Sequence, residues 1–149
     1  MTHVIVFNLT LLLTCAIAFY AGGAPERWTA LVFILGAAAT FVAPFSDALR
    51  PFGRLEPMLL LVDVAMLGGL VGIALRADRY WPLYVSALHF LAIAIHGVKA
   101  IQPTLVPWMY AGASGKIAYP MLVLLAVGAV RHRRRVARFG SDPDWSPLS

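Results

Sequence analysis

Five apolar stretches, each of about 20 residues, follow one another along this chain and are separated by short connections. The stretches cover residues 4–21, 28–45, 57–75, 81–102 and 106–130. Proline, glycine and charged residues are concentrated between them, as is typical of connections between helices. A helix of about 20 residues crosses the ~30 Å hydrocarbon core of a bilayer. The pattern therefore predicts an all-α fold, a polytopic transmembrane helical bundle with five spans.

The composition favours a membrane protein over a soluble one. Of the 149 residues, 60% are hydrophobic and only 13% are charged, whereas about a quarter of the residues of a soluble domain are charged. We interpret residues 1–139 as a single transmembrane helical domain. The polar segment 140–149 contains two prolines and is predicted to be a disordered cytoplasmic tail.

The fifth stretch leaves an alternative open. Lys116 interrupts its apolar run, and Pro120 lies inside it. A proline within a helix removes one backbone hydrogen bond and is expected to kink or break the helix. The stretch is therefore either one continuous span or an interfacial segment followed by a short span, and a four-span bundle is the alternative fold.

Basic residues are concentrated directly after the fifth stretch, where five of the chain's twelve Lys and Arg residues lie. They are Arg131, Arg133, Arg134, Arg135 and Arg138. Such clusters mark the cytoplasmic side of a membrane protein and attract anionic lipid headgroups. With five spans, the C-terminus is then cytoplasmic and the N-terminus outside. Nucleic acid is not an expected partner, because no folded module or interleaved aromatic residues accompany the cluster.

Ionisable residues interrupt the fourth stretch, which reads LYVSALHFLAIAIHGVKAIQ and contains His89, His96 and Lys99. The third stretch contains one such residue, Asp63. A charged residue at the centre of a span costs about 2.5–3.5 kcal/mol, so these groups are expected to have partners or a function. If the two stretches form an antiparallel hairpin, Asp63 and His96 lie at the same depth. Lys99 lies one turn nearer the outer surface.

Counting residues along the fifth stretch places Lys116 at a similar depth. The candidate polar site is therefore Asp63, His96, Lys99 and Lys116, with His89 closer to the cytoplasm. One interpretation is a structural lock, in which Asp63 pairs with Lys99 or His96 and the lysines extend outward. The other is a functional site for an anionic ligand, at which His96 exchanges a proton.

His89 has two interpretations of its own. Its ring either bonds to serine or backbone groups, or ligates haem b, for which His96 is the other candidate. Bis-histidine ligation needs a second histidine at the same depth on a facing helix, and no other span contains one. We therefore predict no cofactor.

Small residues predict close helix packing. Gly68 and Gly72 form a GxxxG pair in the third stretch, and such pairs allow two helix backbones to approach each other. Contact within the chain is favoured over a homodimer interface. Asn8 and Thr10, both in the first stretch, are expected to bond to their own helix backbone.

The sequence contains no recognised catalytic, metal-binding or nucleotide-binding motif, so we expect no enzyme activity and no metal site. The stretch RADRYWPLYVSALHFLAIAIHGVKAIQP, followed by AYPMLVLLAVGAVRHRRR, resembles uncharacterised small polytopic inner-membrane proteins of bacteria. The resemblance implies a location in the bacterial inner membrane. The predicted role is accessory or structural, in a homo-oligomer or a larger membrane complex. The alternative is a small proton-linked carrier, or a binder of an anionic ligand or lipid headgroup, that uses the intramembrane Asp/His/Lys layer.

Overall fold

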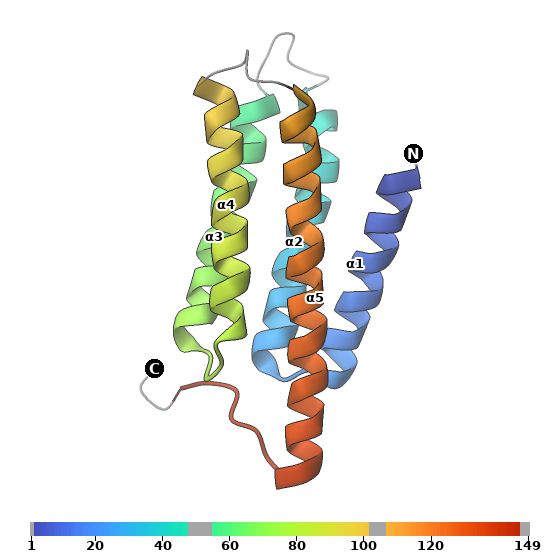
Figure 1. The fold of residues 1–149 in the computed structure, drawn as a ribbon, viewed down its shortest axis with the longest axis vertical. Helices are drawn as coiled ribbons and strands as arrows, with labels where there is room; N and C mark the ends of the chain where they lie inside the picture. Colours follow the sequence, from blue (N-terminus) through green and yellow to red (C-terminus); the bar gives the residue numbers. More distant parts are fainter. Residues whose placement is uncertain (1, 48–54, 102–106, 147–149) are drawn as a thin grey trace.

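The computed structural model describes the backbone of residues 2–47, 55–101 and 107–146, and the side chains of residues 3–42, 58–95 and 116–146. Within these ranges the protein is a bundle of five α-helices, which confirms the predicted all-α class (Figure 1). The helices are α1 (Thr2–Ala21), α2 (Ala24–Asp47), α3 (Leu55–Arg76), α4 (Trp81–Ile101) and α5 (Pro107–Phe139). They follow the five apolar stretches, because each stretch is long enough for its backbone N–H and C=O groups to hydrogen-bond to one another within a helix.

Helix α5 is continuous through Pro120 and extends past the apolar stretch into the arginine cluster. Arginine is a good helix former, so the change from apolar to basic residues at Arg131 does not end the helix. Gly140 ends it instead. Its φ of 79° is in the left-handed region, and its N–H donates to the Val136 carbonyl at 2.9 Å.

The helices pack as sequential neighbours around a core that runs along the bundle. Helix α3 lies between α2 and α4, and α5 packs against α1, α4 and α2. The core is formed by small and aliphatic residues from all five helices, with one phenylalanine: Leu11, Cys15, Ala18, Ala30, Phe33, Leu70, Val85, Met121, Leu122, Leu125 and Ala129. Alanine and cysteine at these positions allow the helices to approach closely.

Helices α2 and α3 approach each other closely at Gly36 and Gly69, and not at the predicted pair Gly68 and Gly72. A Cβ added to Gly36 of α2 would lie 2.0 Å from the Met66 sulfur, and one added to Gly69 would lie 3.2 Å from a Val32 methyl group. No atom of the described residues lies within 4 Å of a Cβ added at Gly68 or Gly72. The prediction that this pair packs inside the chain is therefore wrong, because the side of α3 that faces α2 carries Met66 and Gly69.

Two polar residues of α1 are satisfied locally. Asn8 donates to the Val4 carbonyl at 2.9 Å, and Thr10 donates to the Val6 carbonyl at 2.8 Å. Both acceptors lie four residues earlier in the same helix, which confirms the prediction. Neither side chain needs a partner from another helix.

The described part of the C-terminal tail differs from the predicted disorder. It returns from the end of α5 to the α3–α4 connection (Figure 1). There Ser146 N–H donates to the Arg76 carbonyl at 2.8 Å, and Trp145 forms an isolated antiparallel bridge with Ala77. The tail is held because its two aspartates, Asp142 and Asp144, face arginines of the folded bundle.

Candidate functional site

Two connections, α1–α2 and α3–α4, meet the C-terminal tail at one end of the bundle. The buried guanidinium of Arg79, in the α3–α4 connection, lies at their centre, and only 4% of its side chain is exposed. Its partners come from α2, α5 and the tail, segments far apart in the sequence. We call these residues the Arg79 cluster: Glu26, Arg79, Trp81, His132, Arg135, Asp142 and Asp144.

Both terminal nitrogens of Arg79 are engaged with acids. One forms an ion pair with Glu26, whose side chain is fully buried. The other lies 2.8 Å from an Asp142 oxygen, 3.1 Å from an Asp144 oxygen and 3.2 Å from the Pro143 carbonyl. Arginine stays protonated in proteins, so this side chain is a permanent cation that offsets buried negative charge.

Glu26 lies in the first turn of α2, where the sequence specifies its position. The Gly22–Gly23 turn ends α1, and the Glu26 carboxylate accepts the Gly23 N–H at 3.0 Å, as in a capping box. A carboxylate near a helix N-terminus also interacts favourably with the helix dipole. The other Glu26 oxygen accepts the Trp81 indole N–H at 3.2 Å. Both oxygens of this buried carboxylate are therefore hydrogen-bonded.

Two glycines provide the space for the cluster. A Cβ on Gly23 would lie 2.0 Å from an Asp144 oxygen, and a Cβ on Gly128 would lie 2.9 Å from the Trp81 ring. Gly23 thus allows the tail to reach the α1–α2 turn. Gly128 allows the Trp81 indole to lie against α5.

Asp142 joins the tail to α5. Arg135 donates to both of its oxygens, at 2.7 Å and 3.1 Å, and His132 Nδ1 lies 2.6 Å from one of them. The same Nδ1 lies 2.8 Å from Arg79, but one nitrogen cannot donate to Asp142 and accept from Arg79 at once. The shorter contact is to a carboxylate, so we assign the proton to Nδ1, donating to Asp142.

The pKa of Asp142 is lowered from its ordinary value of 3.8. Burial raises it, but hydrogen bonds from Arg135 and His132 and the positive charge of Arg79 outweigh that effect. A carboxyl with a lowered pKa stabilises the fold at pH values above 3.8. That contribution is lost as the pH falls below 3.8 and through the folded-state pKa.

Asp142→Asn is therefore expected to lower the stability by about 1–3 kcal/mol at pH 7, since it removes charged hydrogen bonds. Thermal unfolding in detergent at pH 7, 5 and 3 measures the difference from the wild type. The difference should be similar at pH 7 and 5 and shrink at pH 3. The exposed Asp78 provides the matched control, because Asp78→Asn should change little at any of these pH values. A difference that persists unchanged at pH 3 would contradict the assignment of charge to Asp142.

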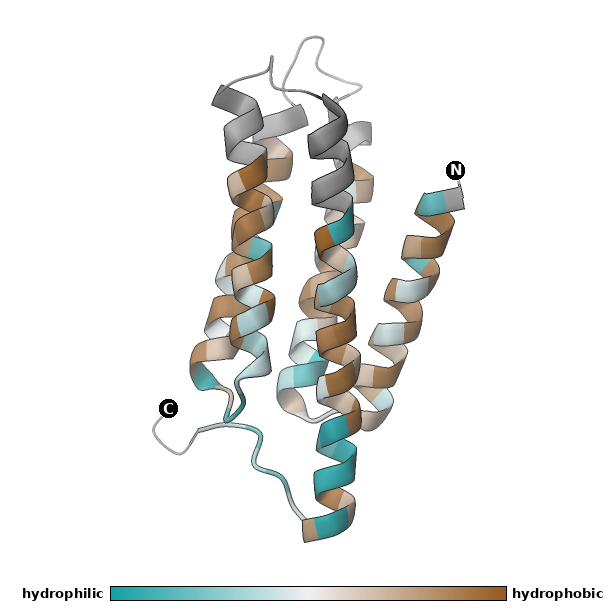
Figure 2. Cartoon of the chain, in the orientation of Figure 1, coloured by the Kyte–Doolittle hydropathy of each residue, from teal (hydrophilic) through white to brown (hydrophobic). Residues whose placement is uncertain are grey.

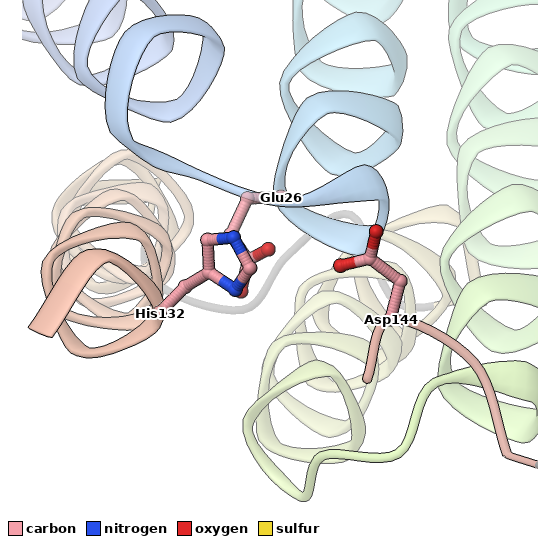
Figure 3. A group of neighbouring side chains, drawn as sticks. All are labelled: Glu26, His132 and Asp144. Carbon is pink, nitrogen blue, oxygen red and sulfur yellow. The ribbon is translucent and has the colours of Figure 1, made fainter. Parts of the chain in front are cut away.

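Three of the cluster's side chains also have the chemistry of metal ligands. Donor atoms of Glu26, His132 and Asp144 all lie within 4.8 Å of one another (Figure 3). These residues are far apart in the sequence, which is why no ligand motif is visible there. The Arg79 guanidinium donates hydrogen bonds to Glu26 and to Asp144. A positive charge of the protein itself therefore already balances the two carboxylates among these three residues. The arrangement is therefore that of an ion-pair network.

Charge and geometry together define what this network can do. Three carboxylates face two arginines and one histidine, so the charges nearly cancel. The network connects the first turn of α2, the α3–α4 connection, the end of α5 and the tail. Removing one member of such a network leaves an uncompensated buried charge, so the network specifies one arrangement of these segments. Its chemistry is that of a structural lock.

The residues of the predicted intramembrane layer are brought together only in part. His89 is buried, and its Nε2 lies 3.0 Å from the backbone carbonyl of Asp63. This contact agrees with the interpretation that His89 bonds to a backbone group.

The other residues of the predicted layer do not form a cluster within the part of the chain that the structure describes. Lys116 is exposed on α5, which packs on α1, α2 and α4. The side chains of His96 and Lys99 lie outside the described residues. Asp63 is half-buried on α3. The lock interpretation of these residues stays a prediction, and the structure locates a different lock at the Arg79 cluster.

The sequence does not single out the Arg79 cluster, because Arg79 is one basic residue in a short, polar connection between two apolar stretches. Two signals were available. Glu26 follows a Gly-Gly turn at a capping-box position, and the tail carries Asp142 and Asp144 directly after the arginine run. Opposite charges in adjacent segments favour pairing, but no sequence rule identifies Arg79 as the shared partner.

Comparison of the chain with family models, curated proteins and solved structures finds no match. The resemblance to small bacterial inner-membrane proteins therefore stays a prediction. The function has to be inferred from exposure, charge and contacts in this chain.

Proposed function

We propose that the chain is a structural or accessory protein of the bacterial inner membrane, in which all five helices span the bilayer and the Arg79 cluster locks their cytoplasmic end. The observation that carries the proposal is a bundle whose long apolar helices are mostly exposed. Residues 3–21 and 58–76 form two helices long and apolar enough to cross a membrane, and Trp81–Ile95 forms a shorter apolar helix. Only 22% of the first window and 17% of the second are buried.

The exposure of these apolar helices supports a membrane location over a soluble one. The core helix of a soluble protein meets the same length and composition, but it is covered by other elements. Here hydrophobic residues occur along the described parts of all five helices (Figure 2), and many of their side chains are exposed. Leu13 of α1, Leu35 of α2, Leu61 of α3 and Phe90 of α4 are each more than half exposed. Soluble monomers rarely expose a continuous apolar surface of this extent, which supports immersion in lipid.

Aromatic and charged residues support the position of one membrane boundary. Tyr20 at the end of α1, Trp28 at the start of α2 and Tyr80 beside α4 are all exposed, as interfacial aromatic residues are. They lie at the same end of the bundle as the Arg79 cluster and the arginine-rich end of α5. An excess of arginine on this side favours a cytoplasmic location. The lock then lies at the level of the headgroups, where buried charge costs less than in hydrocarbon.

Spin-label accessibility tests this proposal with full-length protein in liposomes. In a Cys15→Ser background, labels at Leu61→Cys and Ser141→Cys compare the α3 surface with the exposed tail. The Leu61 label is expected to be relaxed more by oxygen, which partitions into lipid, than by a water-soluble nickel chelate. The Ser141 label should show the opposite preference. Equal access of the nickel chelate to both labels would overturn the membrane proposal.

A further inference from the structure

The exposed side of α5 continues without a break from apolar to basic residues. Met121, Leu125 and Ala129 are buried against the bundle, and Val123, Val127 and Val130 are exposed. At about 100° per residue, the three valines lie within an arc of about 60° on the side opposite the buried residues. In the proposed membrane arrangement, this arc faces lipid.

Three of the five clustered arginines extend the same arc. Arg131, Arg134 and Arg138 are exposed and lie within about 60° of one another, directly after the valines along the helix. No described residue forms an ion pair with any of the three. We call these three residues the arginine face.

The other two arginines have partners inside the protein. Arg133 lies over the Tyr20 ring, with 4.9 Å between the guanidinium carbon and the ring centroid. Arg135 forms the two hydrogen bonds to Asp142 that hold the tail. The structure therefore separates one basic cluster into two arginines that contact other side chains of the protein and three that form no ion pair with any described residue and lie on the side of the valines.

We infer that the arginine face binds the phosphates of anionic phospholipids in the cytoplasmic leaflet, an inference that rests on the proposed membrane location. Guanidinium groups bind phosphate through paired N–H donors, so they suit this partner. The three arginines extend over about 10 Å along the helix, a length comparable to the headgroup layer. They are positioned just beyond the lipid-facing valines, at the depth where the phosphates lie.

Lys116 gives an independent check of this depth. It is exposed and lies on the same arc of α5, about 22 Å from Arg131 and 27 Å from Arg134 along the helix. The hydrocarbon core is ~30 Å thick, and a lysine side chain extends several ångströms toward the interface. One face of α5 thus presents a cation at each boundary with an apolar surface between them, which is the spacing that a bilayer requires.

The test compares two variants that remove the same charge from the same end of the protein. The first is Arg131→Gln, Arg134→Gln, Arg138→Gln. The second is Arg27→Gln, Arg76→Gln, Arg133→Gln, which leaves the arginine face intact. Full-length proteins in micelles are titrated with phosphatidylglycerol or phosphatidylcholine, and bound lipid is counted by native mass spectrometry.

The wild type and the second variant are expected to bind phosphatidylglycerol in preference to phosphatidylcholine. The first variant should lose at least about tenfold of that preference, because each arginine that lies at the lipid phosphates contributes about fivefold to the binding of anionic lipid. Replacing the three arginines by lysine should retain most of the preference, because the charge remains. Equal losses in both glutamine variants, or no preference in the wild type, would overturn the inference.

Extraction of membranes with alkaline carbonate tests the proposed membrane location separately from the lipid preference. Wild-type protein that stays in the membrane supports the location even if the lipid preference fails.

Discussion

Replacement of Arg79 by methionine is expected to lower the free energy of unfolding by about 3–5 kcal/mol. The change leaves Glu26 fully buried without its ion-pair partner, and the tail loses two ion pairs and the hydrogen bond to the Pro143 carbonyl. A buried, unpaired carboxylate must either remain charged at high cost or take up a proton. For a chain of this size the melting temperature should fall by about 10 °C, measured by circular dichroism in detergent.

Arg76→Met is the matched control for this experiment. Arg76 is three residues earlier, its side chain is exposed, and only its backbone carbonyl contacts the tail. Exposed substitutions of this kind usually change stability by less than about 0.5 kcal/mol. Equal losses from Arg79→Met and Arg76→Met would show that the buried position of Arg79 has no special importance.

The second large effect is expected from Gly36→Leu. A Cβ at this position would lie 2.0 Å from the Met66 sulfur, so even the first atom of a side chain requires the Met66 side chain to move. Methionine is flexible, but the rest of a leucine has no space in this contact. Overpacking is expected to cost about 1–3 kcal/mol, measured as a fall in melting temperature in detergent.

Gly68→Leu and Gly72→Leu on α3 are the controls, because open space surrounds both positions. Each should preserve the melting temperature, and leucine in a helix is preferred over glycine by a fraction of a kcal/mol. If Gly68→Leu destabilises the protein as much as Gly36→Leu, the assignment of the α2–α3 contact to Gly36 is wrong.

The helices could be predicted from the sequence because each depends on residues close together in the chain. Runs of about 20 apolar residues and the prolines between them place four of the helices to within a few residues of the observed bounds. The fifth apolar stretch ends at residue 130, nine residues before the observed end of α5 at Phe139. Hydropathy changes at Arg131, whereas helix propensity does not.

The candidate site could not be predicted because it depends on contacts between distant residues. Glu26 and Arg79 are separated by 53 positions, and Arg79 and Asp142 by 63. A basic residue in a loop is usually solvated, so nothing local to Arg79 indicates that its side chain is buried. The tail was predicted to be disordered from its composition, but its two charged residues, Asp142 and Asp144, pair with arginines that only the folded bundle brings close.

We infer that Arg79 holds together the end of the bundle where α1 joins α2 and α3 joins α4, because it neutralises the buried Glu26. A double-mutant cycle with Arg79→Met, Glu26→Gln and the combined variant measures the coupling directly, from unfolding free energies of the full-length protein in detergent. We predict that the combined variant recovers much of the stability lost in Arg79→Met, because the neutral amide no longer needs a cation. Strictly additive losses in the combined variant would contradict the claim.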